Sequence, residues 1–280
     1  MNDEIKSWKT GKEHISFSEV ADWLNCMFQH KLKHIDKLGT SGVTPHLFFG
    51  TGVHASNEKY ILTRNMDVSI AHKEITSGWE ENLELFTKGP FPSWAPDGYG
   101  SLNDWIDKAT KITNDVPKFL DLMFPNWECV AVEEQLYENI PNHYLKFKGY
   151  IDGILSTKDA RGHKKYWIID WKTCGWGWQK SKQEDFKVQL QLLLYKYFWT
   201  TKHGINPRDV KCAFALLKRD GKPGMSVSLI PVQSGPTPVE KGLNVINNHI
   251  RNVEKGFFIK NREACKFCEF SNTDFCPPNL

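Results

Sequence analysis

The second half of the chain alternates runs of β-branched and aromatic residues with turn residues, and this alternation constrains the fold more than any other feature. The runs are residues 128–138, 144–155, 165–173, 210–218 and 225–232. Between the third and fourth runs, residues 184–204 form an apolar-rich stretch of helical length that ends at a glycine. Strands arranged around one long helix predict an α/β fold with a mixed β-sheet flanked by helices.

The first part of the chain differs, because its apolar residues recur at helical spacing. We expect Ser18 to be the N-cap of the first helix. The helices expected outside the strand-rich part are residues 16–35, 50–62, 70–86, 102–123 and about 238–255.

No clear linker divides the sequence, so residues 1–280 are expected to form one domain. Its expected parts are a helical N-terminal region (about 1–125), a sheet core (about 126–235) and a C-terminal helix with a cysteine-rich tail (about 236–280).

The charge balance is nearly even, with a formal net charge of +3. This value neither requires nor excludes a nucleic acid as partner. No apolar run approaches the about 20 residues of a membrane helix, and the N-terminal residues are polar. We therefore expect a soluble, cytoplasmic protein.

Charged side chains stand near the ends of two predicted strands. Asp152 lies in the second run, and Asp170 and Lys172 flank a tryptophan in the third. Side chains alternate along a strand, so Asp170 and Lys172 share one face. If the two strands pair as a hairpin, their carboxylates can lie close together and repel each other unless a cation lies between them. Such hard oxygen ligands suit Mg²⁺ or Mn²⁺, whereas a simple surface ion pair is the alternative.

The seven cysteines are unevenly distributed. Three of them lie in or beside apolar stretches and are expected to be small buried hydrophobes: Cys129, Cys174 and Cys212. Another three cluster near the C-terminus: Cys265, Cys268 and Cys276. Without a secretory signal, a disulfide framework is not expected, and ligation by thiolates alone suits an iron–sulfur cluster or structural Zn²⁺.

An ordered series of motifs resembles the PD-(D/E)XK nuclease superfamily. More narrowly, it is similar to the RecB and AddB nuclease domains and to related CRISPR-adaptation exonucleases. The motifs are Gly52-Val53-His54, Gly149-Tyr150-Ile151-Asp152, Asp170-Trp171-Lys172 and Gln191 with Tyr195. Residues from about 65 to 127 match no motif of the family.

The resemblance implies a restriction-endonuclease-like fold and a role for each motif. His54, Asp152 and Asp170 would hold Mg²⁺ or Mn²⁺, and Lys172 would position the attacking water. Gln191 and Tyr195, four residues apart on one helix face, would steady Lys172 or the DNA backbone.

Each motif residue also has a simpler interpretation. Alone, His54 would be a partly buried helix histidine, and Tyr195 would belong to the core. Glu58 would be solvated or would support a ligand. Either Glu133 or Glu134, on the preceding strand, could point toward the metal ions.

In iron–sulfur members of this family, a fourth cysteine comes from the N-terminal region, and Cys26 occupies that place. The resemblance favours a [4Fe–4S] cluster on Cys26 and the three tail cysteines over Zn²⁺. Such a cluster would clamp the helical N-terminal region to the C-terminus.

The segment after the third strand combines aromatic and basic residues. Trp176, Trp178, Lys180 and Lys182 could stack bases and hold phosphates, as in single-strand binding proteins. Alternatively, the tryptophans pack against the following helix.

Together, these features predict a metal-dependent DNA exonuclease, a hydrolase acting at DNA ends or in single strands. Its expected role is in DNA recombination or processing, where a recombination protein could be its partner; if the chain is viral, it would act in the host cytoplasm. A structure- or site-specific DNA endonuclease and a non-catalytic DNA-binding subunit are the alternatives. The sequence does not predict an oligomeric state.

Overall fold

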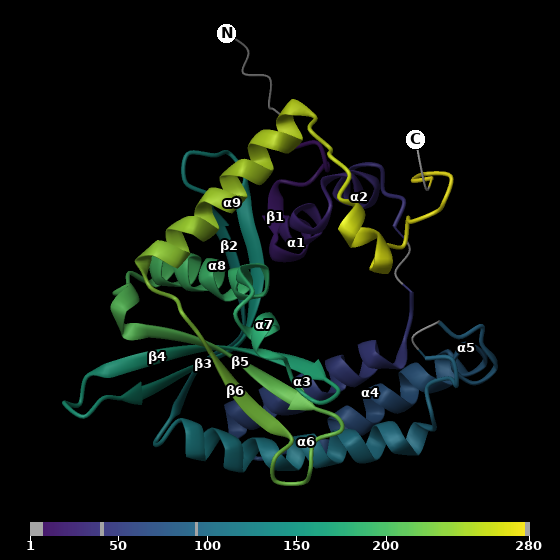
Figure 1. Ribbon diagram of the computed structural model, residues 1–280. Coiled ribbons are helices and arrows are strands. Elements are labelled where there is room, and N and C mark those ends of the chain that lie inside the picture. The colour runs from purple at the N-terminus through teal and green to yellow at the C-terminus, as the bar shows by residue number, and fades with distance from the viewer. Residues whose placement is uncertain (1–7, 40–41, 93–94, 278–280) are drawn as a thin grey trace.

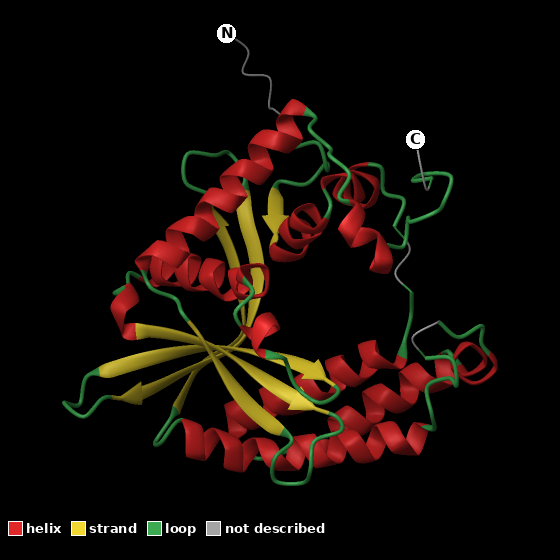
Figure 2. Cartoon of the chain, in the orientation of Figure 1, coloured by secondary structure: helices red, strands yellow, loops and turns green. Residues whose placement is uncertain are grey.

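The computed structural model describes residues 8–39, 42–92 and 95–277. The first seven residues, which belong to the polar N-terminal segment, lie outside this part. The described residues form a six-stranded mixed sheet between helical layers (Figures 1 and 2). The strands are β1 (His14–Ser16), β2 (Glu128–Asn139), β3 (Lys146–Lys158), β4 (Lys164–Cys174), β5 (Val210–Lys218) and β6 (Val227–Val232). The predicted α/β fold with a mixed sheet is confirmed.

The long strand β3 organises the sheet. Antiparallel β2 pairs with one edge of β3 along most of its length. The other edge is shared, because parallel β1 pairs with residues 146–148 and antiparallel β4 pairs with residues 153–158. The sheet continues from β4 through parallel β5 to antiparallel β6. Residues 149–152 therefore lie where one edge of β3 changes its partner.

Helices cover the two faces of the sheet and bury two separate apolar cores (Figure 1). The first core joins one face to α1 (Phe17–Asn25), α8 (Phe186–His203) and α9 (Pro236–Lys255). The second joins the opposite face to α3 (Pro45–Thr63), α4 (Val68–Glu81) and α6 (Leu102–Met123). The short helices are α2 (Met27–His30), α5 (Leu83–Lys88) and α7 (Lys180–Gln183).

Most predicted elements are confirmed, and the corrections all lie in the helical N-terminal region. The helix expected at 50–62 begins earlier, at Pro45, and the one expected at 70–86 consists of two helices, α4 and α5. Strand β1 lies within a region expected to be helical, because three residues are too few to show a strand period.

The helix expected at 16–35 is wrong as one element. Ser16, not Ser18, is its N-cap and accepts a hydrogen bond from the Glu19 backbone N–H. The helix ends at Cys26, whose backbone is extended at φ −158° and ψ 116°, and α2 and a π-helical turn (Lys31–Ile35) follow.

The break at Cys26 brings this part of the chain beside the C-terminal segment (Figure 1). The backbone N–H of Phe28 donates to the carbonyl of Ile259, and that of Asn261 donates to Cys26 Sγ at 3.3 Å. None of the helices in the described ranges has the length and apolar character needed to cross a bilayer.

Candidate active site

The expected carboxylates meet where β3 and β4 diverge. Gly153 pairs with Ile169, so the next opposed residues along these antiparallel strands are Asp152 and Asp170. Beyond this point, an Asp152 side-chain oxygen, Oδ2, accepts a hydrogen bond from the Trp171 backbone N–H at 2.7 Å. The Asp152 side chain thus accepts a hydrogen bond where the backbone pairing of β3 and β4 has ended, and this bond fixes the carboxylate at the opening between the strands.

Burial and mutual repulsion dominate the electrostatics of the two carboxylates. Burial, together with the charge of Asp170, raises the pKa of Asp152 well above its ordinary value. Burial also raises the pKa of Asp170, although Lys172 opposes this effect. The protein therefore keeps two acidic groups together at an electrostatic cost that a bound cation would relieve.

Lys172 lies on the same sheet face as Asp170. Its Nζ is 2.8 Å from Asp170 Oδ2, and its side chain is 35% exposed whereas that of Asp170 is 2% exposed. The ammonium group thus connects a buried carboxylate with the solvent-facing side of the site.

His54 enters the site from α3. Gly52 allows this helix to pack closely on α4, because a Cβ atom there would lie 3.0 Å from the backbone of Ala71. His54 Nδ1 lies 3.7 Å from Asp152 Oδ2, and the His54 side chain is 30% exposed. Burial and the nearby Lys172 charge lower the pKa of His54 to about 4, so its neutral imidazole can offer a lone pair to a metal ion.

Gln191 and Tyr195 approach from α8. Gln191 Nε2 donates to the Tyr195 hydroxyl at 3.1 Å. The tyrosine ring lies over Gly149, where a Cβ atom would be only 2.6 Å from Tyr195 Cε1. Burial raises the pKa of Tyr195 above its ordinary value, so its hydroxyl stays protonated beside the carboxylates.

Of the two glutamates considered on β2, only Glu133 faces the site. Val132 pairs with Gly153 and Glu134 with Ile151, which places Glu133 opposite Asp152. Its backbone adopts a φ of +47°, a strained value of the kind that clusters at functional sites. Burial and the charges of Glu58 and Asp170 raise the pKa of Glu133.

Glu134 points elsewhere and anchors α8. It accepts hydrogen bonds from Trp199 Nε1 and Lys202 Nζ, both at 2.8 Å, and its Oε1 lies 2.6 Å from His203 Nε2. Alternation along the strand could have predicted that only one of the two glutamates shares the face of Asp152, but not which one.

The aromatic and basic segment borders Lys172. Lys172, Trp178 and Lys182 help to line a cavity of about 500 Å³. Trp178 packs against Phe214 of strand β5 with ring centroids 5.1 Å apart, whereas the packing alternative had placed it against the following helix. Trp176 is 78% exposed, and so remains open to a ligand. Lys180 is also exposed and forms an ion pair with Glu184 at 3.6 Å.

The cysteines divide into two groups. One cavity of about 220 Å³ is lined by residues that include Cys26, Cys265, Cys268 and Cys276. Burial raises the pKa of Cys268, and so do the other three thiols. Outside this cavity, Cys212 is buried as expected, whereas Cys129 is exposed and the expectation of burial there is wrong.

A comparison with known protein families assigns the chain to one of them. The sequence profile of the PD-(D/E)XK nuclease superfamily matches residues 14–277, and the chain therefore belongs to this superfamily of nucleases. No curated protein matches the chain.

Among solved structures, 16 chains match. One is a protein from Eubacterium rectale, named as a presumed exonuclease, with a TM-score of 0.57 and 13% identity. The match covers 97% of this chain and 92% of that one, and at such identity it concerns the fold alone. Another, named SSO0001, has 15% identity and a TM-score of 0.34, and the match covers 82% of this chain and 97% of that one.

Proposed function

We propose that the chain is a metal-dependent DNA exonuclease that hydrolyses phosphodiester bonds at DNA ends or in single strands. The observation that carries the proposal is the convergence of His54, Asp152, Asp170 and Lys172 from three separate elements. A structural ion pair would need only Asp170 and Lys172. It would not explain a neutral histidine and a second buried carboxylate beside them.

The donors fit a divalent cation. His54, Asp152 and Asp170 would hold Mg²⁺ or Mn²⁺, because hard carboxylate oxygens suit these ions. Burial raises the pKa of both aspartates, and the charge of Asp170 raises that of Asp152 further, so a cation would stabilise their ionised forms. Glu133 adds a further carboxylate at the exposed rim. When bound, such an ion polarises the phosphate and lowers the pKa of a coordinated water.

The chain's own groups position the reactants. Lys172 can donate hydrogen bonds to an attacking water or to a phosphate oxygen while Asp170 fixes its ammonium group. The Tyr195 hydroxyl, oriented by Gln191, offers a protonated donor beside the carboxylates. Attack on phosphorus would displace the 3′-oxygen and leave a 5′-phosphate.

The segment around Trp176 supplies a path for DNA. Its exposed indole can stack on a base, and Lys182 and the exposed Lys180 can contact phosphates. This arrangement beside Lys172 supports an unpaired strand or a frayed end as substrate. A role in DNA recombination or processing would suit such an activity.

The decisive experiment compares end-labelled linear DNA with circular single strands of the same sequence, with and without Mn²⁺ or Mg²⁺. We expect metal-dependent shortening of the linear DNA and an intact circle. Cleavage of the circle would favour an endonuclease instead. Binding without cleavage under all metal conditions would favour a DNA-binding subunit.

We also propose that Cys26, Cys265, Cys268 and Cys276 bind a [4Fe–4S] cluster. Four thiols line one cavity, and the other three raise the pKa of Cys268; a positively charged iron centre would stabilise all four as thiolates. Anaerobic purification should yield a brown protein that contains iron and acid-labile sulfide. A colourless protein with zinc bound to sulfur would assign Zn²⁺ to this cavity instead.

A further inference from the structure

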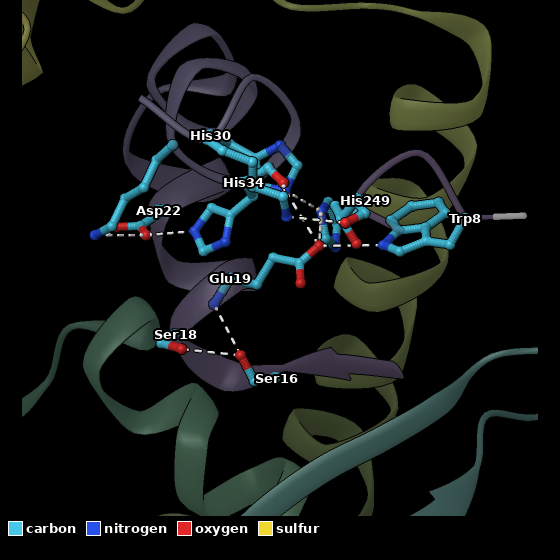
Figure 3. A network of polar contacts seen from close by, with 11 residues as sticks. Trp8, Ser16, Ser18, Glu19, Asp22, His30, His34 and His249 are labelled. Carbon is cyan, nitrogen blue, oxygen red and sulfur yellow. Dashed lines mark hydrogen bonds and ion pairs between the residues drawn. The ribbon is translucent and has the colours of Figure 1, made fainter. Parts of the chain in front are cut away.

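A cluster of titratable side chains lies buried outside the active site, between the N-terminal helices and α9 (Figure 3). It consists of Glu19 on α1, His30 on α2 and His249 on α9, and we name these residues the buried triad. All three residues are 0% exposed. The nuclease reaction proposed above uses none of them.

Three donor atoms of the buried triad converge on one point. His30 Nε2 lies 3.2 Å from His249 Nε2 and 3.3 Å from Glu19 Oε1. His249 Nε2 and Glu19 Oε1 are 3.9 Å apart. In a tetrahedral zinc site, bonds of ~2.0–2.1 Å place donor atoms about 3.4 Å from one another, which is close to this spacing.

Protons alone do not satisfy these contacts. An imidazole nitrogen carries at most one hydrogen, which lies in the ring plane and points in one direction. A hydrogen on His30 Nε2 can point at Glu19 or at His249, but it cannot form a straight bond to both. The separation of His249 from Glu19 is too long for a hydrogen bond. A cation at the centre of the three atoms would meet all three lone pairs.

The second carboxylate oxygen supplies a further donor. Glu19 Oε2 is buried and has no hydrogen-bond partner within the described part of the chain. Trp8 Nε1 donates to Glu19 Oε1 at 3.3 Å, as outer groups do when they orient metal ligands. Four donor atoms, two nitrogens and two oxygens, are therefore available.

Aromatic rings close the cluster. The Trp8 and Trp23 rings contact the His249 ring at centroid distances of 5.8 and 5.3 Å, and both tryptophans are buried. Burial, with the nearby His30 and His34, lowers the pKa of His249 well below its ordinary value, so its ring is neutral and keeps a lone pair.

We propose that the buried triad is a structural zinc site that fastens α1 and α2 to α9. Imidazole nitrogens and carboxylate oxygens are ligands that Zn²⁺ takes, and full burial with a second carboxylate oxygen in the fourth position leaves no place for a substrate, which makes the role structural. The site would connect His30 and His249 across 219 residues of sequence. It would lie beside the cysteine cavity, since α2 follows directly after Cys26 and ends at His30.

The first test is the zinc content of the full-length protein, produced with added zinc and exchanged into excess Mg²⁺. We expect about one tightly held zinc ion per chain in the wild type, bonded to nitrogen and oxygen at ~2.0–2.1 Å by X-ray absorption. Glu19→Gln and His249→Asn should each reduce retained zinc by at least about tenfold. Asp152→Asn should retain it, which separates this site from the active site.

His203→Asn is the matched control. It removes a histidine that contacts a glutamate, Glu134, outside the buried triad, and it should leave the zinc content unchanged. Equal zinc in the wild type and in His249→Asn, or a zinc shell made of sulfur neighbours near ~2.3 Å without nitrogen and oxygen, would overturn the proposal.

A second test has its main readout on the wild-type protein, with Glu19→Gln as a comparison. A strong zinc chelator should lower the melting temperature of the wild-type protein, and Zn²⁺ but not Mg²⁺ should restore it. The isosteric Glu19→Gln protein should not respond. A zinc-free wild type that melts at the same temperature with and without added zinc would show that the buried triad holds only protons.

Discussion

The active site and the buried triad both combine carboxylates with histidine, but they differ in charge balance and in access to solvent. At the active site, Asp152 and Asp170 are opposed on adjacent strands, and Lys172 is 35% exposed. In the buried triad, one carboxylate lies between two imidazoles, and all three residues are 0% exposed.

The difference separates a site that substrate and water must enter and leave from a site that must stay closed. Burial raises the pKa of both carboxylates, and the charge of Asp170 raises that of Asp152 further, which favours a cation at an opening that substrate and water can also reach. The buried triad is fully buried, with Trp8 and Trp23 packed against the His249 ring, and leaves no room for substrate. We therefore expect substitutions at the first site to alter chemistry and those at the second to alter stability.

The largest expected effect is on cleavage. Lys172→Ala should reduce the cleavage rate by about 10²–10³-fold or more, because it removes a donor placed where charge develops on the phosphate. Asp170→Ala should be at least as severe. Single-turnover cleavage of a labelled oligonucleotide measures this loss, and DNA binding should persist. A variant at either position that cleaves at the wild-type rate would contradict the assignment of the site.

The next effect is on stability. Glu19→Gln should lower the free energy of unfolding by about 3 kcal/mol, because it removes the only carboxylate of the buried triad and leaves a cation there without its anionic partner. Denaturant unfolding of the full-length chain measures the change. If Glu19→Gln instead keeps the wild-type stability but no longer cleaves DNA, the proposed contrast between the two sites is wrong.

A smaller effect concerns access to the open site. Trp176→Ala should weaken single-strand binding by about 1–3 kcal/mol, the contribution of one base stacked on an aromatic ring. Fluorescence anisotropy with a labelled single strand tests this, and Trp178→Ala provides the comparison, since that ring packs on Phe214. Unchanged affinity for Trp176→Ala would place the DNA path elsewhere.

The smallest effect is opposite in sign to that of Glu19→Gln. Without metal, Asp152→Asn should raise the melting temperature by a few degrees at neutral pH, because it removes a buried charge repelled by Asp170. The raised pKa of Asp152 means that the folded wild type binds more protons than the unfolded chain above the ordinary aspartate pKa. The wild type thus loses stability as pH rises through this range, and the advantage of the variant should shrink on acidification. Thermal melts of the wild type and of Asp152→Asn over a series of pH values measure this difference in melting temperature.

The fold was largely predictable, because strand and helix periods depend on local residue pattern. The Asp-x-Lys pair at 170–172 follows from strand alternation, and the Gln191–Tyr195 pair follows from helical spacing. The role of Glu133 was not predictable in this way. Whether Glu133 or Glu134 faces the site depends on the register between β2 and β3 and on the positive φ of Glu133, and the sequence reveals neither.

The buried triad could not be predicted from sequence. Its members are separated by 11 and 219 residues, and no short motif links them. Their convergence depends on the break at Cys26, where an uninterrupted helical period had been expected. The contacts at this break come from the C-terminal segment, far away in the sequence, and leave no local pattern to detect.

The shared edge of β3 has a consequence for how far the chain can be shortened. Three residues, His14–Ser16, lie end to end with β4 along the strand that carries Asp152. A fragment that starts after them would leave the backbone of residues 146–148 without its partner and would present an edge on which a second molecule could add a strand. The shortest fragment that folds as a nuclease on its own must therefore retain His14–Ser16, even though Asp152 and Asp170 come much later in the sequence.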